Sequence, residues 1–131
     1  MLKPAVVALT LALASAALLP APAFAQSTLA AVDTDKDGTI DHNEATTAAG
    51  AVFDKLDVDH DGTLDAKELK GRISKKDWAT ADPDKDGSIT RDEYLAYVDA
   101  LFKAADKDSE GTLDKKELRS PAGRKLGRLL K

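Results

Sequence analysis

The twelve residues Asp33-Thr-Asp-Lys-Asp-Gly-Thr-Ile-Asp-His-Asn-Glu44 recur, with few changes, three more times in this chain of 131 residues. The further copies begin at Asp57, Asp82 and Asp106, so successive copies start 24, 25 and 24 residues apart. Every copy has acidic residues at positions 1, 3, 5 and 12, a glycine at position 6 and an aliphatic residue at position 8. A solvated acidic surface would not fix its charges in this way, so the repeat indicates four copies of one binding loop.

The spacing of the acids suits a hard divalent cation of the size of calcium, which takes about six to eight oxygen ligands from a flexible loop. Side chains at positions 1, 3 and 5 can point at one centre, and the glycine allows the sharp reversal with positive φ that follows. Position 7 offers its carbonyl group, and position 9 usually acts through a water molecule. The glutamate at position 12 reaches back with both oxygens, which favours Ca²⁺ over the smaller, octahedral Mg²⁺.

This pattern resembles the calcium loop of the EF-hand superfamily, in particular small exported bacterial proteins with four such loops, over about residues 29–118. The resemblance implies an all-α fold, an EF-hand helix-loop-helix array with four calcium loops and very short strand pairs between loops. It also implies Ca²⁺ as the bound ion. The implied metal ligands occupy positions 1, 3, 5, 7, 9 and 12 of each loop: Asp33, Asp35, Asp37, Thr39, Asp41, Glu44, Asp57, Asp59, Asp61, Thr63, Asp65, Glu68, Asp82, Asp84, Asp86, Ser88, Thr90, Glu93, Asp106, Asp108, Glu110, Thr112, Asp114 and Glu117.

Two of these residues depart from the family pattern. Thr90 replaces an acid at position 9 of the third loop, which is tolerated because that contact usually runs through water. Glu110 replaces aspartate at position 5 of the fourth loop, where the longer side chain crowds the ion. We therefore expect the fourth site to be the weakest or the least regular.

The segments between the loops predict an unusual pairing. Apolar residues from Ala45 to Leu56, and again from Tyr94 to Ala105, fall on one helical face, so a single helix can both leave one loop and enter the next. In the middle linker, Gly71 can end a helix and Ser74-Lys-Lys-Asp77 resembles a capping box, which predicts two short helices and a turn. We therefore expect loop two to pair with loop three, through Leu64 and Ile89, and loop one to lie near loop four. The ordinary alternative pairs one with two and three with four.

The amino end has the features of a cleavable signal peptide, residues 1–25. A weakly positive start precedes an apolar stretch from Ala5 to Leu19, and Ala23-Phe24-Ala25 matches the small-x-small pattern that signal peptidase accepts. The stretch is shorter than the roughly 20 residues of a membrane span, which disfavours a retained anchor. We expect a periplasmic or secreted protein whose four-EF-hand calcium-binding domain covers residues 26–118.

The last segment, residues 119–131, is basic and amphipathic and contains no acidic residue. Ser120 and Pro121 suit a helix N-cap and first helical position, and Ala122, Leu126 and Leu129 share one face with Leu130. Two interpretations stay open: a terminal helix that packs on the domain, or an element that contacts an anionic membrane surface or an acidic partner. The first is favoured because eleven residues make a weak isolated helix.

Composition narrows the function further. The chain has no Cys, which excludes disulfides, thiolate metal sites and Cys nucleophiles, and its formal net charge of −4 disfavours nucleic acid as a partner. His42 and His60 lie within the loops with no nucleophile network, so we expect no enzyme activity and no catalytic residues. We predict calcium ion binding by an exported buffer, sensor or calcium-stabilised module. The alternative is a calcium-dependent protein-protein interaction or adhesion module of the cell envelope, with an unknown protein partner.

Overall fold

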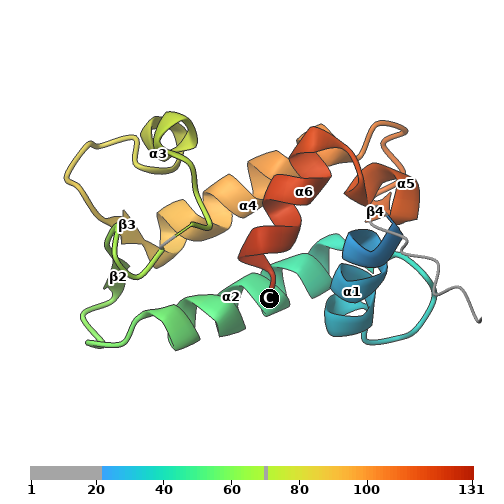
Figure 1. Cartoon of the computed structure of the whole chain (residues 1–131), viewed down its shortest axis with the longest axis horizontal. Helices are drawn as coiled ribbons and strands as arrows, with labels where there is room; N and C mark the ends of the chain where they lie inside the picture. The colour runs from blue at the N-terminus through green and yellow to red at the C-terminus, as the bar shows by residue number, and fades with distance from the viewer. Residues whose placement is uncertain (1–21, 70) are drawn as a thin grey trace, which may run out of the picture.

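The computed structural model describes residues 22–69 and 71–131 (Figure 1). Over these residues the fold is all-α, with two small antiparallel strand pairs, as the sequence predicts. The elements in chain order are α1 (Pro22–Val32), β1 (Ile40–Asp41), α2 (His42–Leu56), β2 (Thr63–Leu64), α3 (Lys75–Ala81), β3 (Ile89–Thr90), α4 (Arg91–Ala105), β4 (Thr112–Leu113), α5 (Lys115–Leu118) and α6 (Pro121–Leu129).

Two long helices, α2 and α4, form the centre of the molecule and pack against each other. Each is a single helix of 15 residues that leaves one loop and enters the next, which confirms the prediction for both. Gly50 lies inside α2 and faces Arg91 of α4. A Cβ atom at position 50 would lie 2.8 Å from a guanidinium nitrogen of Arg91. The Arg91 guanidinium instead lies over the Phe53 ring and pairs with Asp54 at 2.5 Å.

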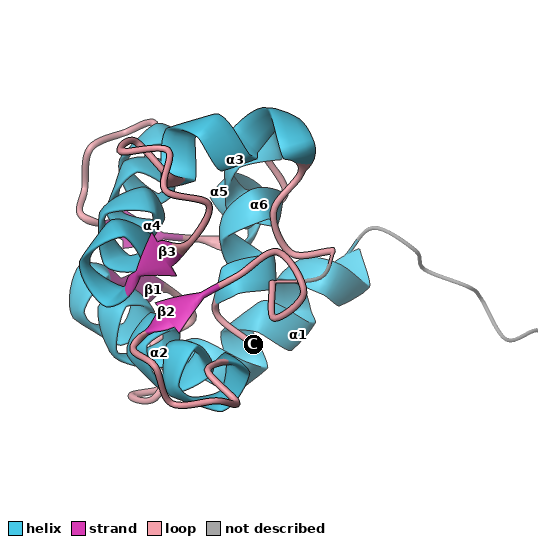
Figure 2. Ribbon diagram, turned by 90° about the vertical axis from the view of Figure 1, so that its left-hand side faces the viewer, coloured by secondary structure: helices cyan, strands magenta, loops and turns pink. Residues whose placement is uncertain are grey.

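The strands pair as β1 with β4 and β2 with β3, one pair at each end of the two long helices (Figure 1), and Figure 2 views the molecule from the β2–β3 end. Ile40 lies opposite Leu113, and Leu64 lies opposite Ile89. All four side chains are fully buried. The predicted pairing of loop two with loop three, and of loop one with loop four, is therefore confirmed, and the ordinary alternative does not occur in this structure.

The middle linker differs in part from its prediction. The second of the two expected short helices is α3, and the hydroxyl of its N-cap, Ser74, accepts the Asp77 N–H at 3.1 Å. The first is only a turn, closed by a hydrogen bond from the Leu69 N–H to the Asp65 carbonyl at 3.1 Å. The capping box is also incomplete, because the Ser74 hydroxyl donates to the Asp77 carboxylate at 2.7 Å. The Asp77 carboxylate therefore accepts a hydrogen bond from the side chain of the N-cap residue.

The carboxyl-terminal helix α6 lies in the core, against α4, α5 and α1. Its apolar face, with Leu126, Leu129 and Leu130, is buried. Ser120 caps it and Pro121 is its first residue, as predicted. The interpretation that this segment packs on the domain is thus confirmed, and the apolar face is not available to a membrane in this arrangement.

The amino-terminal helix α1 begins at Pro22, four residues before the predicted new amino terminus at Gln26. Most of the predicted signal peptide, residues 1–21, lies outside the described residues. Ala25, next to the predicted cleavage point, is fully buried. Among the described helices, none combines the length and the apolar character needed to cross a bilayer.

Candidate metal sites

The four loops share one backbone conformation. Position 4 has a positive φ of 55–60° in every loop, at Lys36, His60, Lys85 and Ser109, and the glycine at position 6 has a φ of 82–87°. The glycine N–H donates to the position 1 carboxylate in each loop, at 2.9–3.0 Å. A residue with a Cβ atom is strained at such a φ. The glycine is therefore needed to turn the backbone toward the first carboxylate.

Each loop gathers three carboxylates whose oxygens lie within 4.8 Å of one another. Loops one, three and four bring together positions 1, 3 and 12, while loop two brings together positions 1, 3 and 5. The groups are Asp33, Asp35 and Glu44; Asp57, Asp59 and Asp61; Asp82, Asp84 and Glu93; and Asp106, Asp108 and Glu117. Charges of one sign at this separation repel one another strongly, so the geometry favours a cation among them.

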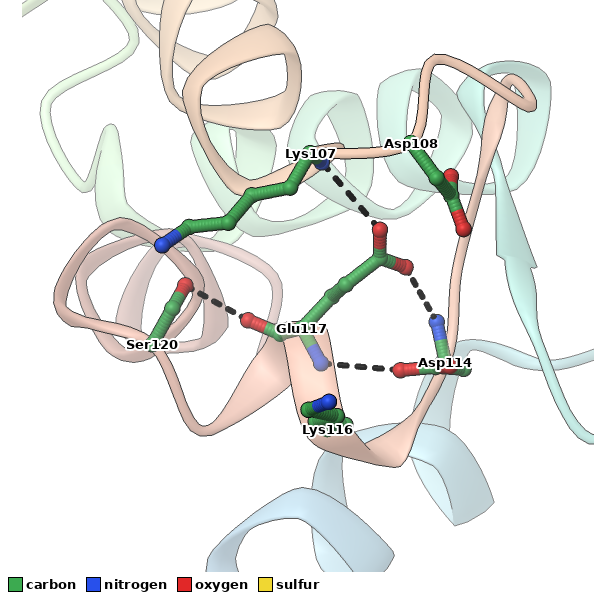
Figure 3. A pocket seen from close by; sticks show the side chains of 6 residues that line it. All are labelled: Lys107, Asp108, Asp114, Lys116, Glu117 and Ser120. Atoms are coloured by element: carbon green, nitrogen blue, oxygen red, sulfur yellow. Dashed lines mark hydrogen bonds between the residues drawn. The ribbon is translucent and has the colours of Figure 1, made fainter.

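Backbone N–H groups orient the position 12 glutamate, at least two of them in loops one, two and four and one in loop three. One of its oxygens accepts the position 9 N–H in every loop, at 2.8–3.1 Å. In loop four the other oxygen of Glu117 accepts the Lys107 N–H at 3.2 Å, as Figure 3 shows. The same bond from position 2 is present in loops one and two, to Glu44 at 2.8 Å and to Glu68 at 3.2 Å. In loops one, three and four the glutamate then lies beside positions 1 and 3, whereas the group of loop two contains position 5 in place of Glu68.

Position 9 serves as the N-cap of the segment that leaves the loop. Its side chain accepts the N–H of the position 12 glutamate in all four loops, at 2.7–3.2 Å. Asp41, Asp114 and Thr90 all complete a capping box in this way. Threonine caps helices nearly as well as aspartate. This explains in local terms why Thr90 can stand where the other loops have an acid.

Position 5 separates loop four from the others. In loops one to three the aspartate carboxylate accepts the N–H of position 7 at 2.8–2.9 Å and its hydroxyl at 2.8–3.1 Å. Glu110 makes neither bond to Thr112 among the hydrogen bonds of the described residues, since its carboxylate stands one methylene farther out. Its pKa is raised, first by the neighbouring Asp108 carboxylate. At position 5, therefore, loop four departs from the other three loops, which agrees with the irregularity that the sequence predicts there.

Loop three holds the most deeply buried carboxylate. Asp82 is 2% exposed, and its Oδ1 is the one buried side-chain polar atom of the described residues that lacks a hydrogen-bond partner. The Asp82 carboxylate raises the pKa of Asp84 to about 6. A buried oxygen without a partner is costly. An ion bound in the loop would give this oxygen a partner, so the residues present fit a metal ion.

Loop three also has a proline at position 2, which sequence reasoning did not single out. Pro83 carries no N–H, so Glu93 receives no bond corresponding to the Lys107–Glu117 bond of loop four. The sequence shows that position 2 of loop three lacks an N–H donor. The role of that donor becomes clear only from the hydrogen bonds of the other loops. In loop one, by contrast, burial opposes ionisation of Glu44, yet hydrogen bonds from Asp41 and Thr34 hold its pKa below the usual value.

Comparison with known families supports this geometry. A family model described as EF hand matches residues 25–44, 50–71 and 98–120. Loop three, residues 82–93, lies outside these three segments, although it shares their backbone conformation. In its fold, its repeated loops and the matched segments the chain resembles the EF-hand class of proteins.

Within this class the chain is similar to lanmodulin from Methylorubrum extorquens. The two are 62% identical over 68 residues, which cover 47% of this chain and 51% of lanmodulin. The chain thus spans about half the length of the relative that it matches. The family matches and the four carboxylate groups together indicate a metal-binding protein of the EF-hand type.

Proposed function

We propose that this chain binds four Ca²⁺ ions, one in each loop. The ligands are the residues at positions 1, 3, 5, 7, 9 and 12 that the sequence identifies, with position 9 acting through water. The observation that carries the proposal is the fourfold gathering of carboxylates, together with the unpartnered buried oxygen of Asp82. All the donors are oxygen, and position 12 is glutamate in every loop, a donor set that suits Ca²⁺ better than Mg²⁺.

Ion binding should also order the chain. Without an ion, up to five carboxylates crowd each loop, and four divalent ions more than cancel the formal net charge of −4. Because the loops hold the ends of α2 and α4, repulsion within a loop works against the packing of both helices. The free energy of ion binding then adds to the free energy that stabilises the folded chain.

Calorimetric titration of the purified chain with Ca²⁺, and separately with Mg²⁺, tests the proposal. We expect four Ca²⁺ per chain and weaker Mg²⁺ binding. Exchanging position 12 for glutamine, one loop at a time, should remove one ion each; the variants are Glu44→Gln, Glu68→Gln, Glu93→Gln and Glu117→Gln. Circular dichroism in chelator and then in Ca²⁺ should show a gain of helix. A chain that takes up no Ca²⁺ at millimolar concentration would refute the proposal.

A trivalent ion of similar size is the second candidate. Each of the four loops carries five acidic residues, so a divalent ion leaves a loop with three excess negative charges and a trivalent ion leaves two. Electrostatic attraction therefore favours the higher charge. Competition of La³⁺ against bound Ca²⁺ decides between the two ions: displacement at stoichiometric La³⁺ would favour the trivalent ion.

The cellular role is proposed from the sequence. The signal peptide, residues 1–25, directs export, and residues 26–118 then serve outside the cytoplasm as a calcium buffer, sensor or calcium-stabilised module. Amino-terminal sequencing of the exported protein should find Gln26 first. Since α1 begins at Pro22, this cleavage would leave its last seven residues, Gln26–Val32.

An interaction or adhesion module is the alternative role. An open hollow of about 400 Å³ beside α3, lined by Leu69, Ile73 and Trp78 among others, would be the place for a partner. Substitution Ile73→Asp should abolish calcium-dependent capture of such a partner while ion stoichiometry stays at four. If capture persists, the hollow is not the contact.

A further inference from the structure

We propose that α6 couples the four metal sites, acting as a built-in target helix that docks when the loops are loaded and thereby makes ion binding cooperative. This rests on the proposed function, because it assigns a regulation to those same sites. The evidence is the set of anchors that hold α6. They come from segments adjacent to all four loops.

The strongest anchors follow the position 12 glutamates directly. Tyr94 comes immediately after Glu93 of loop three, is fully buried, and donates its hydroxyl proton to the Leu129 carbonyl at 2.7 Å. In loop four the Glu117 carbonyl accepts both the N–H and the hydroxyl of Ser120, at 3.0 and 2.6 Å, and Ser120 is the N-cap of α6. A shift of either glutamate toward an ion therefore moves an anchor of α6.

Loop two reaches the other end of the helix. Arg72, four residues after Glu68, donates from one guanidinium nitrogen to the Arg128 carbonyl at 2.7 Å and also to the Lys131 carbonyl. A cation at the carboxyl end of a helix interacts favourably with its dipole. The segment that enters loop three adds an ion pair between Asp77 and Lys125 at 2.9 Å.

Loop one contributes through α1, the helix that enters it. The part of α1 that remains after the predicted cleavage still contacts α6, since a Cβ atom on Gly127 would lie 3.1 Å from the Thr28 hydroxyl. The Lys131 ammonium donates to the Ser27 hydroxyl at 2.7 Å, a second contact that the predicted cleavage leaves in place.

These anchors explain how the coupling works. A bound ion would hold the position 12 glutamate beside positions 1 and 3 and would thereby fix the first turn of the segment that follows. All contacts that hold α6 can form at the same time only when the segments next to the four loops are in their folded positions. The docked helix is thus favoured in the loaded chain, and by reciprocity a docked helix favours loading of the remaining loops.

The test uses the full chain and the single tryptophan. Trp78 lies one turn before loop three, and its carbonyl accepts the Asp82 N–H at 2.8 Å, so its fluorescence reports ion binding in that loop. Gly127→Ala disturbs the contact of α6 with α1, far along the chain from loop three. We expect four ions still to bind, but the Ca²⁺ midpoint of the Trp78 signal to rise by about fivefold or more, the range of ordinary allosteric coupling, and the titration to become less steep.

Two further variants keep the test decisive. Ser120→Ala removes the cap of α6 with little risk to folding, and it should shift the Trp78 midpoint in the same direction. Arg124→Ala on the exposed face of α6 is the control and should change the midpoint by no more than about twofold. Midpoints for Gly127→Ala and Ser120→Ala that equal the control would overturn the coupling. A wild-type chain without any ion response would instead refute the proposed function.

Discussion

The substitution Glu110→Asp should strengthen the fourth metal site. In loops one to three the position 5 aspartate accepts both the N–H and the hydroxyl of position 7, and loop four makes neither bond. The shorter side chain would place its carboxylate where Thr112 can donate twice. Because the ion orders the loop, whatever stabilises the ordered loop adds to ion affinity.

The size of the effect follows from these two bonds. Each intramolecular hydrogen bond contributes about 0.5–1.5 kcal/mol net, and exposed loop bonds belong to the lower half of that range. Two of them give about 1–2 kcal/mol, which corresponds to an affinity gain of about 5- to 30-fold. The reverse change in loop one, Asp37→Glu, removes bonds to Thr39 of 2.8 Å each and should weaken that site by a similar factor.

Amide NMR signals of the loop glycines resolve the sites one by one. The Gly111 N–H donates to the Asp106 carboxylate at 2.9 Å, and the Gly38 N–H donates to Asp33 at the same distance, so each responds to an ion in its own loop. Glu110→Asp should move the Gly111 midpoint and leave that of Gly38 far less changed. If both swaps leave their own midpoints within about twofold of wild type, the position 5 bonds do not set affinity.

Three further outcomes are expected. Pro83→Ala supplies loop three with the position 2 N–H that orients the glutamate in the other loops. The Trp78 fluorescence midpoint for Ca²⁺ should therefore fall by about 2- to 10-fold, the contribution of one hydrogen bond; a higher midpoint would contradict this. The pKa of Asp84 is raised to about 6 in the ion-free chain, so this carboxyl must lose its proton when an ion binds. Below about pH 6 the ion affinity should therefore fall, and binding should release protons. The release is measurable as a calorimetric enthalpy that depends on the buffer, and this dependence should disappear at pH 8. Leu64→Ala removes a fully buried side chain from the β2–β3 pair and should lower the free energy of unfolding by about 2–5 kcal/mol in urea titrations with Ca²⁺. Val58→Ala, at a side chain that is 75% exposed, should lower the free energy of unfolding far less.

The loops and the long helices were predictable because both depend on local pattern. Acid spacing, the glycine at position 6 and a single apolar face between loops leave little freedom to the chain. The turn at Leu69 was mistaken for a helix because no local signal separates a single turn from a short helix. The amphipathic face of α6 favoured its burial but did not by itself decide between packing on the domain and contact with a membrane or partner. Its anchors, such as Arg72 and Tyr94, lie far away in the sequence and become neighbours only in the folded chain.

The period of the repeat itself determines which loops can pair. A helix of 15 residues, as in α2, is about 22 Å long, whereas paired strands lie about 4.8 Å apart. Loops one and two stand at opposite ends of α2, so they cannot pair with each other, and α4 separates loops three and four in the same way. Each pair must therefore draw one loop from each half of the chain, and α2 and α4 must pack together for either pair to form. Ions at one end then stabilise the pair at the other, so the chain should unfold as one unit, without a separately folded half.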